Sequence, residues 1–265
     1  MKRVRLALAL IAAALLATAA PASARITRSR SSASTTAPSA VAPSFWAPLA
    51  SIVFGLGIEY QTDSEQTEFA IPFLLEYNVT ERLKLILEPE YASIDSKSPD
   101  EPSLDGFGDL EAALDYEFLS ERRYRPALSL EGRIKWPTAS DPDLGEPGTD
   151  YTLGLIASKD FVFVELDLNV LYTFTGDREQ GDAVEVSLAS EWHVNRYVDV
   201  IAEVASVTRT GVFRNAGSGG RDDLEATLGL GWRISKNLRF EQGVVFSEGG
   251  GWAAVVAWEW NFGGD

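Results

Sequence analysis

Apolar residues recur at every second position from Ile52 to the C-terminus. A spacing of two is the period of a β-strand, whose side chains alternate between the two faces of a sheet. The alternating segments number about twelve and are roughly ten residues long, which is the length of a tilted membrane-spanning strand. They cover residues 52–60, 69–77, 83–91, 110–118, 128–136, 151–157, 162–174, 184–192, 198–204, 224–234, 238–246 and 252–262.

The positions between these apolar residues carry charge, whereas the apolar face itself holds no Asp, Glu, Lys or Arg, as a lipid-facing band requires. We therefore predict an all-β fold, a transmembrane antiparallel β-barrel of about twelve strands. Its charged faces would line a lumen. The candidate lumen-facing residues are Glu88, Glu111, Asp115, Glu131, Arg133, Lys135, Glu165, Asp167, Glu185, Glu203, Glu225, Arg233, Arg239 and Glu241.

A soluble sandwich or barrel would alternate in the same way, with its apolar face inside. Aromatic residues favour the inverted, membrane arrangement, because they gather at the ends of the predicted strands as interfacial girdles do. They are Tyr60, Tyr77, Tyr91, Phe118, Trp136, Tyr151, Phe174, Trp192, Trp252 and Trp260.

The predicted connections also alternate between short and long, which is the asymmetry of outer-membrane barrels. The short ones are 78–81, 120–123, 158–160, 193–196 and 235–237. The others are 61–67, 93–107, 137–150, 175–182, 207–221 and a tighter 247–250. An even number of strands would place both termini at the end with the short turns, on the periplasmic side.

The N-terminus reads as an export signal. Residues 1–24 contain the basic positions Lys2, Arg3 and Arg5, an apolar run, and an A-x-A cleavage site that ends at Ala24. A membrane anchor is the alternative, but the run is short for one. Residues 25–48 are rich in Ser, Thr, Ala and Pro without periodicity, so we expect a flexible periplasmic tail, followed by the barrel at 49–265.

Composition narrows the range of functions. The 265-residue chain has a formal charge of −16, which argues against nucleic acid as a partner because such binding needs a cationic surface. Removing the three cations of the signal peptide brings the charge to −19. The absence of Cys excludes disulfides and thiolate metal sites, and the single His excludes most polyhistidine sites. We expect no cofactor and no metal.

Two motifs support a family resemblance. Residues 106–110 read G-F-G-D-L and residues 130–138 read L-E-G-R-I-K-W-P-T. Their order resembles the outer-membrane family named after the meta-pathway of phenol degradation, which has a signal peptide, a G-x-G-D strand start and a K-x-P-T strand end. The resemblance covers roughly Phe69 to the C-terminus, and Ala139 stands where the family has Gly. It implies an outer-membrane barrel that helps small, often aromatic, compounds to cross.

The last strand resembles the assembly signal of bacterial outer-membrane proteins. Trp258, Trp260 and Phe262 alternate near the C-terminus, and three further residues follow. The resemblance implies the barrel-assembly machinery as a partner, together with outer-membrane lipid.

Four further groups of side chains have candidate roles. The inward carboxylates would favour cations in the lumen, or they would only solvate it and pair with the basic residues across strands. His193, in a predicted short turn, could serve a Ser190 nucleophile in an outer-membrane hydrolase. The acidic loop from Asp141 to Asp150 could hold Ca²⁺ or simply be solvated. Pro89 lacks an N–H and predicts a bulge or a strand end.

The reading that these patterns favour is a non-enzymatic outer-membrane channel for the passive passage of small solutes, hydrophobic or aromatic ones among them. The alternative is a structural or interaction protein with an occluded lumen and partner-binding surface loops. A hydrolase centred on His193 is the third hypothesis.

Overall fold

The computed structural model describes residues 51–63, 66–98, 103–177, 181–210, 222–248 and 250–263. The predicted signal peptide and tail lie outside these residues. Within the described ranges, no helix has the length and apolarity that crossing a membrane would need.

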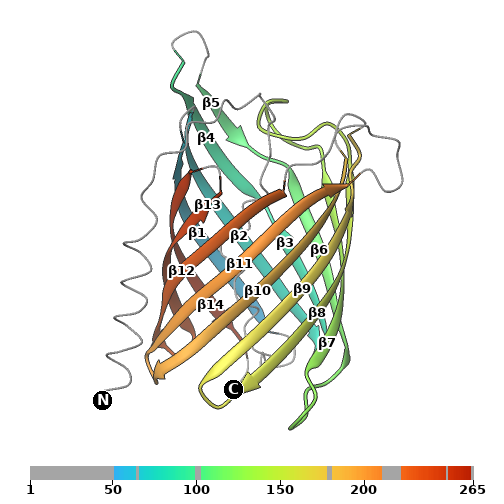
Figure 1. Ribbon diagram of the computed structural model, residues 1–265, viewed down its shortest axis with the longest axis vertical. Coiled ribbons are helices and arrows are strands. Elements are labelled where there is room, and N and C mark those ends of the chain that lie inside the picture. Colours follow the sequence, from blue (N-terminus) through green and yellow to red (C-terminus); the bar gives the residue numbers. More distant parts are fainter. Residues whose placement is uncertain are drawn as a thin grey trace. The chain divides into compact units, whose positions relative to one another are not determined.

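Fourteen antiparallel strands make up the described part of the chain and form one sheet (Figure 1). They are β1 (Ile52–Thr62), β2 (Gln66–Thr80), β3 (Leu83–Glu88), β4 (Glu90–Ser96), β5 (Leu104–Phe107), β6 (Leu110–Leu119), β7 (Ala127–Trp136), β8 (Asp150–Phe161), β9 (Val164–Phe174), β10 (Asp182–Asn195), β11 (Val198–Thr210), β12 (Asp222–Ser235), β13 (Leu238–Ser247) and β14 (Trp252–Phe262).

Strands β3 and β4 act as one interrupted strand, and so do β5 and β6. Counted in this way, the wall has the predicted twelve strands. Both β3 and β4 pair with β2 in the same register on the two sides of Pro89, which confirms the strand end, one of the two outcomes expected there. The β2–β3 register shifts only next to the turn, between Asn78 and Thr80. The second interruption, at Gly108 and Asp109, is a β-bulge, because the register slips by one residue between β5 and β6. The sequence did not predict this bulge.

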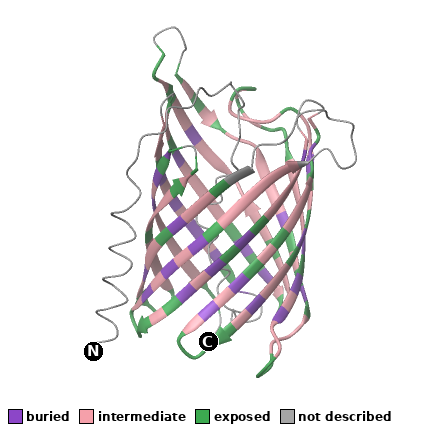
Figure 2. Ribbon diagram, in the orientation of Figure 1, coloured by how far each residue is buried: buried purple, intermediate pink, exposed green. Residues whose placement is uncertain are grey.

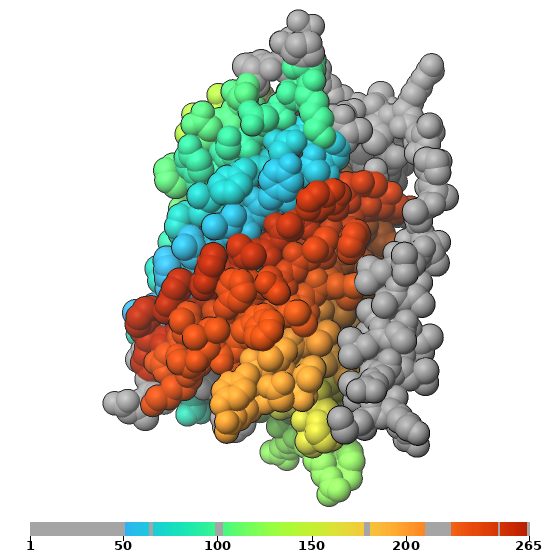
Figure 3. Space-filling model, turned by 90° about the vertical axis from the view of Figure 1, so that its left-hand side faces the viewer, coloured from blue at the N-terminus to red at the C-terminus, as the bar shows by residue number. Residues whose placement is uncertain are grey.

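The sheet closes on itself. β1 pairs with β2 on one side and with β14 on the other, from Ile52 opposite Phe262 to Thr62 opposite Trp252. Figure 3 shows the first strands lying directly beside the last ones. Closure gives the edge strands partners, so the backbone groups of the wall bond within the wall. The all-β, closed antiparallel barrel predicted from the alternation is confirmed.

Burial shows which face of the wall is apolar. Large apolar side chains are exposed, such as Leu153 at 62%, whereas Glu59 is only 3% exposed and Asp199 is fully buried. Figure 2 shows buried and exposed residues alternating along the strands. The buried apolar residues are Ala, Val and a single Ile among the described positions. A soluble barrel would have the reverse arrangement, so the fold is that of a membrane barrel.

The connections differ in length at the two ends of the barrel. Two-residue turns at 81–82, 162–163, 196–197 and 236–237, with the hairpin at 120–126, lie at the lower end in Figure 1, which we call the short-turn end. The other connections form the long-loop end. The predicted loop at 93–107 is shorter than expected, because β4 continues to Ser96 and β5 begins at Leu104. His193 is part of β10, and its expected place in a turn was wrong.

The inverted burial can be tested with one lysine on the outer face. Leu155 lies near the middle of β8 and is 45% exposed. We expect Leu155→Lys to lower the free energy of unfolding in lipid vesicles by about 2–4 kcal/mol, because a charge at the bilayer midplane is poorly solvated. The measurement is urea-induced unfolding in vesicles, with Leu155→Met as the matched control.

In a water-soluble protein, an exposed Leu changed to Lys shifts stability by only about 0.5 kcal/mol in either direction. Equal stability of Leu155→Lys and the parent chain would therefore contradict the membrane arrangement.

Candidate functional site: the charged lumen

The fourteen candidate residues occupy one continuous face of the wall. They lie on β3, β6, β7 and β9 to β13, at positions that alternate with the exposed apolar residues, and every one is buried or half-buried. In a closed wall whose other face is apolar and exposed, this face is the interior one. The structure brings many of the charged groups together in two networks, pairs Lys135 separately, and leaves other carboxylates between them.

The first network surrounds Arg133 on β7, and we call it the Arg133 network. Its guanidinium contacts Glu111 on β6, lies 3.2 Å from Glu88 on β3, and lies 3.1 Å from Glu131 on its own strand. One cation therefore holds three carboxylates from three neighbouring strands. The planar, forked geometry of guanidinium suits such multiple contacts, which an ammonium group would make less well.

Lys135, two residues further along β7, ties the wall to a loop. Its ammonium contacts Glu146 in the 137–149 loop and lies 2.9 Å from Asp150 at the start of β8. Both carboxylates belong to the acidic stretch for which Ca²⁺ binding was one of two alternatives, and here a lysine of the chain itself balances their charge. Asp141 accepts a hydrogen bond from the backbone N–H of Asp143, a local turn contact.

The bulge at Asp109 anchors the same loop. The Asp109 carboxylate accepts hydrogen bonds from the backbone N–H groups of Thr138 and Ala139, both at 3.0 Å, and of Glu146 at 2.8 Å. The Thr138 hydroxyl in turn accepts one from the Leu110 N–H at 2.9 Å. The Asp of the G-F-G-D run and the Thr of the W-P-T run therefore hold the loop to the barrel. Sequence spacing alone did not show that these motifs meet.

The second network lies near the short-turn end, and we call it the turn-end network. Arg239 binds both carboxylate oxygens of Glu191, at 2.7 and 3.1 Å, and its Nε lies 2.5 Å from Glu241. Arg233 lies 2.9 Å from Asp199, whose same oxygen is 3.0 Å from His193 Nδ1. Two guanidinium groups thus face three carboxylates and an imidazole across β10 to β13.

This second network contains the one cluster of metal-ligand type among the described residues, formed by Glu191, His193 and Asp199. The guanidinium groups of Arg233 and Arg239 already lie against all three side chains. A divalent cation would have to displace these contacts and approach two fixed positive charges. The cluster is therefore better described as part of an ion-pair network than as a metal centre.

The expected partner of His193 lies on the other face of the wall. Ser190 follows the outward register, and its hydroxyl accepts a hydrogen bond from Trp192 Nε1 at 3.2 Å. His193 shares the inward register with Glu191 and contacts Asp199. A serine nucleophile and its base must be within hydrogen-bond reach, and side chains on opposite faces of one strand are not. The hydrolase constellation is therefore not assembled from this pair.

Several interior carboxylates have oxygens without a hydrogen-bond partner in the described part of the chain. They are Oε2 of Glu59, Oδ1 of Asp115, Oδ2 of Asp167 and Oδ2 of Asp199. Carboxylates also outnumber basic groups along the inward register as a whole. Since an ionised carboxylate needs water, hydrogen bonds or cations around it, this interior suits a hydrated, negatively charged lumen.

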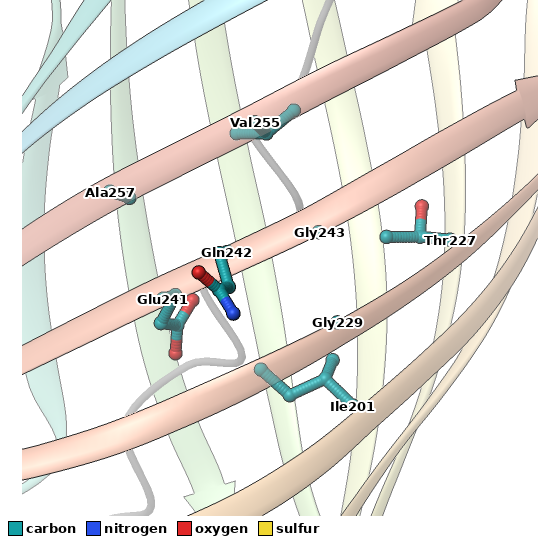
Figure 4. Close-up of a pocket in the computed structure, with 8 residues that line it drawn as sticks. All are labelled: Ile201, Thr227, Gly229, Glu241, Gln242, Gly243, Val255 and Ala257. Carbon is teal, nitrogen blue, oxygen red and sulfur yellow. The ribbon is translucent and has the colours of Figure 1, made fainter.

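One stretch of the interior differs from the rest. Gly229 on β12 faces Gly243 on β13, and Val255 and Ala257 follow on β14. Together with neighbouring groups they border a small hollow in the inner wall (Figure 4). A Cβ on Gly229 would lie only 2.9 Å from the carbonyl oxygen of Gln242, so this close backbone approach requires glycine. The carboxylate of Glu241 borders the hollow at the turn-end network.

Sequence reasoning missed several residues that the structure brings into these networks. Glu191 and Asp199 are not among the fourteen candidates, although they hold the two arginines. Their signal was present, because both continue the alternation that placed Glu185 and Glu203 inside. Asp109 carried no such signal, since a bulge interrupts the alternation there.

Comparison with known proteins supports the fold. No protein-family model matches the chain, and no curated protein matches it. The crystal structure of the COG4313 outer membrane channel from Pseudomonas putida F1 aligns with a TM-score of 0.66 at 13% identity, covering 81% of this chain and 96% of that chain. The KdgM porin gives 0.56 at 10% identity, with 79% and 99% covered, and the NanC porin gives 0.54 at 9% identity, with 78% and 98% covered. The chain therefore has the fold of outer-membrane channels.

The Arg133 network can be tested by removing its cation. We expect Arg133→Gln to lower the free energy of unfolding in detergent micelles by about 3 kcal/mol, because three carboxylates remain without their shared counter-ion. We expect a cost at the low end of the range for a broken buried ion pair, because water in the lumen would solvate the carboxylates that remain. Glu88→Gln is the matched control, since it removes one contact of three and should cost less. Arg133→Gln as stable as the parent chain would contradict the assigned role.

Proposed function

We propose that this chain is a non-enzymatic channel of the outer membrane through which small solutes pass passively, after export by a cleaved signal peptide. The observation that carries the proposal is the inverted barrel, apolar outside and charged inside. The likeness to the fold of outer-membrane channels and porins supports it. Such a barrel presents a hydrated path through lipid, which no soluble sheet protein needs.

The charge of the lumen determines which ions pass most easily. Interior carboxylates such as Asp115 and Asp167 focus a negative potential in a low-dielectric wall, which raises the local concentration of cations and lowers that of anions. The Arg133 network adds to this negative charge, because it has one cation for three carboxylates. The turn-end network is closer to balance, with two guanidinium groups for three carboxylates.

The apolar stretch of lumen wall around the small hollow extends the proposed range of solutes beyond ions. Its glycine, valine and alanine surface offers contact to a small uncharged or aromatic molecule, within an interior that is otherwise polar. This agrees with the solutes implied by the resemblance to the phenol meta-pathway family, of which we propose the chain to be a member. We also propose outer-membrane lipid and the barrel-assembly machinery as its partners.

Ion selectivity tests the proposal directly. In a planar bilayer under a KCl gradient, we expect single-channel steps and a reversal potential that indicates preference for K⁺ over Cl⁻. Asp115→Asn combined with Asp167→Asn should weaken this preference, because it removes two interior charges. The exposed Asp95→Asn is the matched control and should leave it unchanged.

The preference should also fall as the salt concentration rises, since salt screens the field of the carboxylates. A complete lack of conductance at every voltage would overturn the open-channel proposal.

The second candidate function is an occluded barrel whose surface loops bind a partner. The fastening of the 137–149 loop by Asp109, Lys135 and Ser140 favours it, because a fixed loop at the long-loop end can restrict the passage.

Asp109→Ala separates the two functions, since it removes three of the loop's hydrogen bonds at once. If the loop occludes the lumen, conductance should appear or rise at least several-fold in this variant, with Asp95→Ala as the control. Unchanged conductance would exclude the loop as the barrier.

A further inference from the structure

Three connections at the short-turn end lie side by side. They are the hairpin at 120–126 and the turns at 162–163 and 196–197, which join strands β6 to β11 in the order of the sheet. The Lys159 ammonium donates to the Arg122 carbonyl at 3.2 Å, and the His193 N–H donates to the Phe163 carbonyl at 3.0 Å. These contacts link each connection to the next hairpin, and Figure 1 shows the first two projecting at the lower end of the barrel.

Large apolar side chains project from these connections. Tyr124 is 85% exposed, Val162 83% and Phe163 73%. Turns that face water usually consist of Gly, Asn, Asp and Ser, so this composition is unexpected for a water-exposed surface. The apolar side chains continue the exposed outer face, where Phe118 and Trp192 lie near the same end of the wall. The surface is therefore suited to contact with apolar material.

Cations accompany the aromatic rings in all three hairpins. The Arg123 guanidinium carbon lies 5.1 Å from the Tyr124 ring centre, and the Arg196 guanidinium carbon lies 4.5 Å from the Tyr197 ring centre. Between them, Lys159 Nζ lies 5.5 Å from the Phe161 ring centre. A ring with a cation over its face presents an apolar body and a positive group in the same direction.

The rim is positive in a chain of formal charge −16. Arg122, Arg123 and Arg196 have no ion-pair partner within the described ranges, whereas Lys159 is paired with Glu121. At the long-loop end the charge is opposite, with acidic residues such as Asp141 and Asp177 in the connections. We call the three arginines together with Tyr124 and Tyr197 the basic rim.

We propose that the basic rim binds the headgroups of anionic glycerophospholipids in the leaflet at the short-turn end of the barrel. The guanidinium groups would bind the phosphate through paired N–H donors, while the rings lie at the boundary between headgroups and acyl chains. Continuity with the lipid-facing band favours a lipid over a soluble partner. This inference rests on the proposed membrane function.

Native mass spectrometry of the full chain, folded in neutral detergent, tests the proposal. Phosphatidylglycerol or phosphatidylcholine is titrated separately, and the number of retained lipids is measured. We expect the parent chain to retain phosphatidylglycerol in preference to phosphatidylcholine. Arg196→Gln should weaken phosphatidylglycerol binding about fivefold, and the combination with Arg122→Gln and Arg123→Gln about a hundredfold, as expected for cations near an anionic lipid.

Arg82→Gln is the matched control. It removes a cation from the β2–β3 turn at the same end of the barrel, which lies outside the basic rim, and should leave the preference intact. Inorganic phosphate at the same concentration should not compete, because it lacks the acyl chains that the rings contact.

Two results would overturn the proposal. One is equal retention of both lipids by the parent chain. The other is full retention of phosphatidylglycerol by the triple variant, and this result would point to a protein as the partner of the rim. Conductance in a neutral phosphatidylcholine bilayer is read in parallel. Normal conductance without lipid preference removes only the rim proposal, whereas lipid preference without any conductance removes only the channel.

Discussion

The structure depends on one constraint, which is that no backbone N–H or C=O group of the wall can be left unpaired in a medium without water. A sheet satisfies this demand only when its first strand meets its last, as β1 does with β14 along its whole length. Closure then creates an inner and an outer face of the wall. Because the strand has a period of two residues, successive side chains point alternately to the inner and the outer face. The apolar exterior and the charged interior therefore follow from the same hydrogen-bonded wall.

The interior replaces an apolar core with ion pairs. The buried apolar side chains among the described residues are Ala, Val and one Ile, while Glu131, Glu191 and Asp199 are buried with arginines beside them. Each arginine joins strands that are not all direct neighbours, as Arg239 on β13 does with Glu191 on β10. Such contacts hold the curvature of the wall, and they leave space and charge for water between the networks.

The two ends of the barrel differ in charge and in the form of their connections. Among the described residues of the long-loop end, acidic ones dominate, and Asp109 fastens one loop through three backbone hydrogen bonds. At the short-turn end, the turns are tight and carry arginines over aromatic rings. The long-loop end thus presents negative charge and a fastened loop. The opposite rim presents positive charge and rings to its surroundings.

The sequence by itself determined the wall. Alternation from Ile52 onward predicted twelve spanning strands, their outward faces and the break at Pro89, because strand period and the missing proline N–H are local properties. It also predicted that Arg133, Arg239 and their neighbours share one face.

Tertiary structure decided the rest. Which carboxylate meets which arginine depends on register between strands, and Asp109 meets Thr138 across 29 positions of chain only because a one-residue bulge turns it toward the loop. His193 lies in a strand and not in a turn, since ladder pairing with Asp199 extends β10 beyond the alternating apolar segment. Contacts of this kind are set by how strands align in space, and no periodicity within a single strand contains that information.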